Sequence, residues 1–120
     1  MKSLRKYFIG GLLLLAVTVM PASAVSPDPI VYGIAVERGD KRQVTKWLDA
    51  GMPPDYLADR IGTGLMIAAW NGDIEMMELL VSRGANPRRT NRNGEQAVQL
   101  AAWNGHVAAV RWLLERGAVL

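Results

Sequence analysis

The chain contains no cysteine and only one histidine, His106, among its 120 residues. Without cysteine it forms no disulfide and carries no lipid-modified cysteine, so packing alone must hold the fold together. A single imidazole without thiolate partners does not supply the ligand set of a zinc site. We therefore expect neither a bound metal nor a cofactor.

Sequence patterns for catalysis are also lacking. No Gly-x-Ser-x-Gly elbow surrounds a serine, and no Gly-x-x-x-x-Gly-Lys phosphate loop occurs. Two carboxylate pairs, Asp73 with Glu75 and Asp55 with Asp59, fall at an expected helix start and in an expected loop. Solvated carboxylates have structural reasons to occupy such places. The sequence predicts a protein that is not an enzyme.

An excess of positive charge is confined to the first residues. The formal net charge is +3, but Lys2, Arg5 and Lys6 all precede an apolar run. Without these three, 11 basic residues face 11 acidic ones. A surface that follows nucleic-acid phosphates needs clustered positive charge. We therefore do not expect a nucleic-acid partner.

Residues 1–24 have the three parts of a secretory signal peptide: a basic start, an apolar stretch from Phe8 to Met20, and small residues up to Ala24. A membrane anchor is the alternative, but the apolar stretch is shorter than the ~20 residues of a spanning helix. We expect cleavage after Ala24, no stable membrane anchor afterwards, and a periplasmic or secreted protein, with a bacterial periplasm fitting the short signal. Residues 25–29 then form a stiff, proline-containing lead-in.

The remainder of the chain repeats itself with a period of 33 residues. Residues 68–72, Ala-Ala-Trp-Asn-Gly, return unchanged as residues 101–105, and Gly84-Ala85 returns as Gly117-Ala118. A fixed period of this length is typical of repeat proteins that stack into a solenoid. The sequence predicts one domain over 30–120, with repeats of about 30–57, 58–90 and 91–120.

Each repeat predicts a helix, a tight turn, a second helix and a protruding loop. The first helix ends at a glycine, such as Gly72 or Gly105, which suits a left-handed helix stop. The following residue, which is Asp40, Asp73 or His106, is expected to cap the second helix. That helix carries apolar residues three and four positions apart.

This pattern resembles the ankyrin repeat. Residues 101–106, Ala-Ala-Trp-Asn-Gly-His, and residues 113–118, Leu-Leu-Glu-Arg-Gly-Ala, match the family at every fixed position. The helix-opening Thr-Pro-Leu-His of the family departs here to Thr63-Gly64-Leu65-Met66. The resemblance covers 30–120 and implies an all-α, ankyrin-like solenoid of about three helix-turn-helix repeats that binds a partner protein.

In ankyrin-like stacks the concave face is formed by the loop tips and by the positions before the glycine of each first helix. The resemblance therefore implies partner-binding roles for Asp59, Arg60, Gly62, Trp70, Asn71, Arg92, Asn93, Glu95, Trp103 and Asn104. Trp70 and Trp103 would form a two-rung aromatic ladder of the kind found at binding hot spots. The alternative is that both rings pack across the repeat junction. The run 88–92 either binds an acidic partner or is a solvated loop.

The two ends of the stack differ in polarity. Lys41, Gln43 and Lys46 replace Ile74, Met76 and Leu79 of the middle repeat, which predicts a capping repeat with a polar outer side. The last repeat makes no such exchange. Either its tail folds back over the end, or the end self-associates weakly through Val107, Val110, Leu114 and Leu120. In that alternative function, the protein is a structural subunit that assembles with itself or docks through its last repeat.

Overall fold

The computed structural model describes residues 26–58 and 61–120. In these residues it contains six helices, and the only β-structure is an isolated bridge between Leu57 and Thr63. The helices form three pairs: α2 (Pro29–Glu37) with α3 (Lys41–Asp49), α4 (Gly64–Asn71) with α5 (Ile74–Ser82), and α6 (Ala97–Trp103) with α7 (Val107–Leu114).

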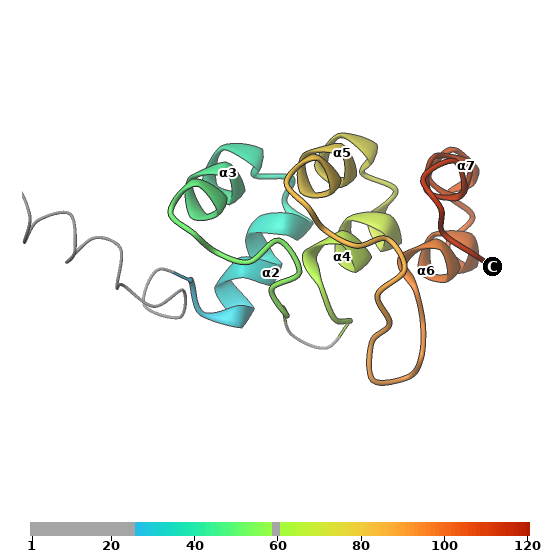
Figure 1. Ribbon diagram of the computed structural model, residues 1–120, viewed down its shortest axis with the longest axis horizontal. Helices are drawn as coiled ribbons and strands as arrows, with labels where there is room; N and C mark the ends of the chain where they lie inside the picture. Colours follow the sequence, from blue (N-terminus) through green and yellow to red (C-terminus); the bar gives the residue numbers. More distant parts are fainter. Residues whose placement is uncertain (1–25, 59–60) are drawn as a thin grey trace, which may run out of the picture.

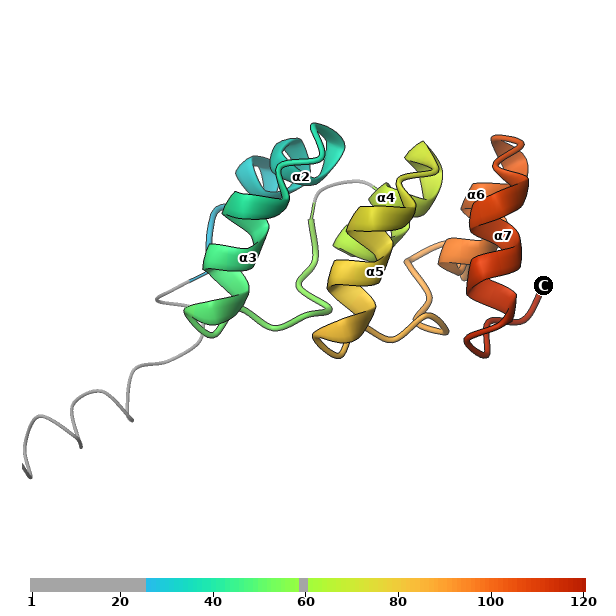
Figure 2. The ribbon, with the colours of Figure 1, turned by 90° about the horizontal axis from the view of Figure 1, so that it is seen from above.

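The three helix pairs follow one another in chain order (Figure 1). The first helices α2, α4 and α6 form one layer, and the second helices α3, α5 and α7 form the other. Figure 2 shows the same succession from above. This arrangement confirms the expected all-α repeat fold. The expected signal peptide, 1–24, lies outside the described residues, and none of the helices described is long and apolar enough to cross a membrane.

Each pair turns at a glycine in the left-handed conformation. Gly39, Gly72 and Gly105 have φ of 71°, 68° and 74°, a region that glycine occupies without steric cost. The next residue begins the second helix. The Oδ1 atoms of Asp40 and Asp73 each accept a hydrogen bond of 3.1 Å from a backbone N–H three residues later. Both aspartates therefore cap their helices as the sequence predicts.

The expected capping role of His106 is wrong. His106 occupies the same position before α7, but its side chain makes no capping hydrogen bond. The imidazole ring lies instead against Gly72, where a Cβ atom would be 2.5 Å from Nδ1. The ring therefore packs between the second and third helix pairs.

The core runs along the stack between the two layers. Ala68, Ala69 and Ala101 on the first helices are fully buried, and their small side chains let α4 and α6 approach closely. The second helices contribute the larger side chains Met77 and Leu113. The core therefore depends on alternating small and large residues from the two layers.

Tyr32 fills the junction between the first and second pairs. Its buried ring packs edge-to-face on Trp47 and Tyr56, with centroid distances of 6.0 and 5.6 Å. A Cβ atom on Gly64 would overlap the Tyr32 hydroxyl. This contact explains why glycine stands where the family pattern has proline. The hydroxyl is buried without a hydrogen-bond partner among the described residues, and burial raises the pKa of Tyr32 above its usual range.

The first pair is a polar cap only on its α3 side. Val44 and Leu48 are buried and Trp47 is half-buried, as predicted. Lys41, however, does not serve the outer side, because its ammonium pairs with Glu75 on α5. The other helix of the pair, α2, exposes three apolar side chains, Ile30, Val31 and Ile34. The prediction of a polar outer side is therefore wrong for α2.

Candidate functional site

Two tryptophans stand at the ends of adjacent first helices. Trp70 lies in the last turn of α4 and is 37% exposed, and Trp103 is the last residue of α6 and is 63% exposed. They occupy the same position in consecutive repeats. The exposed parts of both rings are available for contact with another molecule.

A hydrogen bond joins the ends of these two helices. The Asn104 side-chain amide donates through Nδ2 to the backbone carbonyl of Trp70, at 2.8 Å. Asn71 and Asn104 are both exposed beside the rings. We call Trp70, Asn71, Trp103 and Asn104 the aromatic ledge. The hydrogen bond fixes the two repeats to each other at the point where the ledge is formed.

The segment 86–95 protrudes beyond the layer of first helices (Figure 1). Asn91 organises it. Its Oδ1 accepts from the backbone N–H groups of Asn93 (2.9 Å) and Glu95 (3.0 Å), and its Nδ2 donates to the Ile61 carbonyl (3.0 Å). The sequence prediction included Asn91 only as a member of the run 88–92, although an asparagine two residues before the end of a turn is a known turn-forming signal.

The other candidate residues of the loops differ in how exposed they are. Arg92 and Asn93 are exposed. Glu95 is half-buried, and its Oε1 accepts from Asn91 Nδ2 at 2.6 Å. Gly62 is buried between Met66 and Asn91, so its expected place on the binding face is wrong. Asp59 and Arg60 lie outside the described residues.

Three arginines give the protruding segment a positive surface. Arg88, Arg89 and Arg92 are all exposed, and none of them forms an ion pair with a residue in the described ranges. Exposed guanidinium groups of this kind have the geometry to bind carboxylates.

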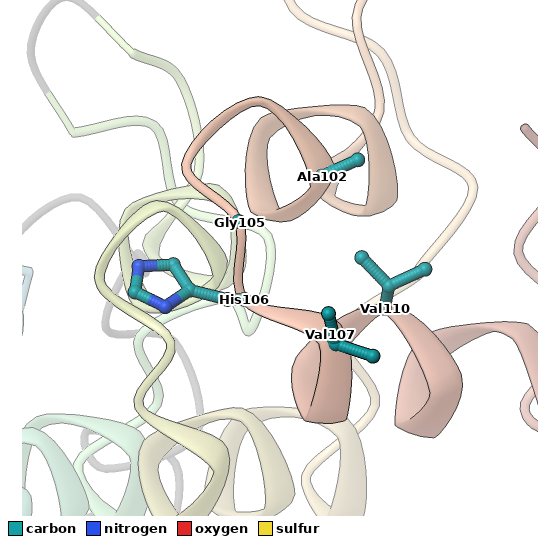
Figure 3. Close-up of a pocket in the computed structure, with 5 residues that line it drawn as sticks. All are labelled: Ala102, Gly105, His106, Val107 and Val110. Carbon is teal, nitrogen blue, oxygen red and sulfur yellow. The ribbon is translucent and has the colours of Figure 1, made fainter.

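The described residues contain few groupings suited to catalysis or metal binding. Across 26–58 and 61–120, no three His, Asp or Glu side chains gather in a way that could hold a metal ion. A shallow hollow of about 240 Å³ lies at the last helix pair, lined by Ala102, Gly105, His106, Val107 and Val110 (Figure 3). Its lining is almost entirely apolar and offers no nucleophile or paired carboxylates. We therefore regard the aromatic ledge and the segment 86–95 as the candidate site.

Comparison with known proteins identifies the family. No curated protein matches the chain. A family model described as ankyrin repeats, in three copies, matches residues 33–120. Ankyrin repeats generally mediate protein–protein interaction and are typically non-catalytic. Because the match covers most of the sequence and agrees with three helix pairs turning at left-handed glycines, this chain belongs to the ankyrin repeat family.

Proposed function

We propose that this protein is a non-catalytic module that binds a partner protein through the aromatic ledge and the segment 86–95. The observation that carries the proposal is the exposure of Trp70 and Trp103 at equivalent positions of adjacent repeats. Exposed tryptophans flanked by amide side chains combine apolar contact area with hydrogen-bonding groups. Tryptophan is enriched at the centres of protein interfaces.

The two parts of the site suit different features of one partner. The ledge carries no formal charge, and its indole rings favour apolar or aromatic side chains. The segment 86–95 presents Arg88, Arg89 and Arg92, which favour carboxylates. We therefore expect a partner surface in which apolar residues lie beside a group of acidic ones.

We also propose that the protein acts outside the cytoplasm, in a periplasm or in the medium. The support for this location is the three-part pattern of residues 1–24 in the sequence. The partner should therefore be sought among exported proteins.

Affinity capture tests the proposed site. The purified protein is immobilised and exposed to periplasmic extract or medium of its own source, beside the variant Trp70→Ala with Trp103→Ala. We expect the variant to hold the captured protein more than tenfold less tightly, because removing a hot-spot side chain costs ~2 kcal/mol or more. The control variant, Arg42→Ala with Lys46→Ala on exposed positions of α3, should capture normally.

The same experiment can contradict the proposal in two ways. If the double tryptophan variant folds, as judged by circular dichroism, and captures the partner as well as the unmodified chain does, the ledge is not the binding surface. If the variant unfolds, the rings serve packing between the repeats, which is the alternative that the sequence left open.

A further inference from the structure

The glycine turns show where one repeat is covered by the next. A Cβ atom on Gly39 would lie 3.3 Å from Asp73 Oδ2, and one on Gly72 would lie 2.5 Å from His106 Nδ1. In each case the covering side chain belongs to the following repeat. At Gly105, chain neighbours aside, no described residue comes within 4 Å of the same place. The contact surface that covers Gly39 and Gly72 is therefore missing at Gly105.

Side chains near these glycines are also less buried in the last repeat than at equivalent positions of earlier repeats. Val44 and Met77 are fully buried, whereas Val110, at the equivalent position, is only half-buried. Leu48 is buried, whereas its equivalent Leu114 is 41% exposed. Val107, which follows the same turn, is 66% exposed. We call Ala102, Gly105, Val107, Val110 and Leu114 the end face.

The end face is hollow at its centre. Figure 3 shows Ala102 on α6 and Val107 and Val110 on α7 around the hollow of about 240 Å³, while the ring of His106 is turned away toward the preceding repeat. The hollow therefore lies beside Gly105, the turn glycine whose Cβ position no described residue covers.

The C-terminal tail does not shield this surface. The backbone N–H of Val119 donates to Gln96 Oε1 at 3.4 Å, next to the start of α6. Val107 and Leu114 remain exposed with the tail in this position, and Val119 and Leu120 are exposed as well. The expectation of a tail folded over the end is therefore wrong for the described structure.

We propose that a second copy of this chain covers the end face, with the two end faces meeting about a two-fold axis. On its α3 side, the opposite end of the stack is a poor alternative partner. There Gln43 and Lys46 hold the positions of buried Met76 and half-buried Leu79, and Arg42 is exposed beside them. A head-to-tail contact between second helices would place Val110 and Leu114 against the cationic side chains of Arg42 and Lys46 and remove those charges from water.

The end face is suited to a copy of itself. Its apolar centre meets an identical apolar centre, and two exposed residues beside it carry opposite charges: Arg111 on α7 and Glu115 just after α7. Each copy therefore offers the other both signs of charge, and like-charge repulsion is small. Arg116 is held over the Trp112 ring, 3.8 Å from the ring centroid. A two-fold contact uses each end face once, so assembly stops at a dimer and does not grow into a filament.

Sedimentation equilibrium of the protein purified from cells expressing the full chain tests the dimer. We expect a reversible dimer in the micromolar range, and a dissociation constant at least about tenfold higher in the variant Val107→Glu with Leu114→Glu. The matched control, Ile30→Glu with Ile34→Glu, places the same charges on the exposed apolar positions of α2 and should dimerise normally. A chain that stays monomeric into the high micromolar range overturns the proposal. A control that disperses the assembly does so too, because it indicates a head-to-tail contact.

Cysteine cross-linking tests the symmetry without depending on the folding of the charged variants. The chain has no cysteine of its own, so the single substitution Val110→Cys reports only contacts of that position with itself. Mild oxidation should convert Val110→Cys into a covalent dimer and leave Ile34→Cys monomeric. In the proposed contact the two-fold axis passes through the hollow that Val110 lines, so this position lies near its own copy, whereas a head-to-tail contact brings it against a different position. Failure of Val110→Cys to cross-link while the protein sediments as a dimer would overturn the symmetric arrangement.

Discussion

The imidazole ring of His106 occupies the space in which a side chain on Gly72 would stand. The two residues are the turn glycine of one repeat and the first residue after the turn in the next. Their contact joins the second and third helix pairs in the way that Asp73 and Gly39 join the first and second. The repeat period therefore places one side chain of each later repeat on the turn of the repeat before it.

Gly72→Ala should destabilise the protein more than Gly105→Ala. Both glycines have positive φ, so each alanine costs about 1–2 kcal/mol of backbone strain. At Gly72 the new methyl group must also displace the His106 ring, whereas at Gly105 it meets no described side chain. We expect an additional loss of about 1 kcal/mol at Gly72, measured by urea unfolding at low protein concentration. Equal losses in the two variants would contradict the packing role of His106.

Asn91→Ala should destabilise the protein by about 2 kcal/mol, because several hydrogen bonds of the segment 86–95 and the link to Ile61 are lost together. Chemical denaturation measures the loss. Asn93→Ala is the control, since Asn93 is exposed and its side chain makes only a long contact of 3.4 Å with Glu95. If the two variants have the same stability, Asn91 does not organise the segment.

Tyr32→Phe should leave stability unchanged or raise it by about 1 kcal/mol. The Tyr32 hydroxyl is buried without a hydrogen-bond partner among the described residues, and such a group carries a desolvation penalty that phenylalanine lacks. The ring contacts with Trp47 and Tyr56 are kept in the variant. Thermal unfolding measures the change in stability. A loss of stability above about 1 kcal/mol would indicate that the hydroxyl does have a hydrogen-bond partner.

The ion pair between Lys41 and Glu75 predicts a pH dependence. The hydrogen bond from Lys41 lowers the pKa of Glu75 below its ordinary 4.5, and the same bond raises the pKa of Lys41 above 10.5. The stabilisation from Glu75 is therefore present above pH 4.5 and is lost as the pH falls through its lowered pKa. The contribution of Lys41 is present below pH 10.5 and is lost as the pH rises through its raised pKa.

Glu75→Gln should consequently lower the melting temperature slightly at neutral pH and have no effect in strong acid. The difference should also shrink in high salt, because both groups are exposed and their attraction is screened. Glu37→Gln, at an exposed carboxylate of α2, is the control. A difference that persists unchanged from neutral pH to pH 2 would show that the pair contributes nothing electrostatic.

Export predicts a defined first residue for the processed protein. Mass spectrometry of the periplasmic or extracellular protein should find Val25 at its N-terminus, because small residues up to Ala24 suit a signal peptidase. Recovery of the chain with Met1 intact in the membrane fraction would contradict cleavage and favour the membrane-anchor alternative.

The repeat architecture could be predicted from the sequence because its determinants are local. Each left-handed turn needs a glycine, as at Gly72, and each aspartate after a turn caps the helix that follows it, as Asp73 does. These requirements act over a few residues and recur every 33 positions, so they are visible in the printed sequence. The family match over residues 33–120 agrees with what this local pattern indicates.

What the sequence did not determine depends on contacts between repeats. His106 occupies a capping position in the pattern, yet its ring packs on Gly72, because the neighbouring repeat offers space there. Lys41 occupies an outer position in the pattern, yet it reaches Glu75 on the next second helix. Only the tertiary structure decided that Trp103 is largely exposed and that Val107 is left uncovered by the tail, because exposure depends on which other element lies against a residue, and a sequence pattern does not contain that information.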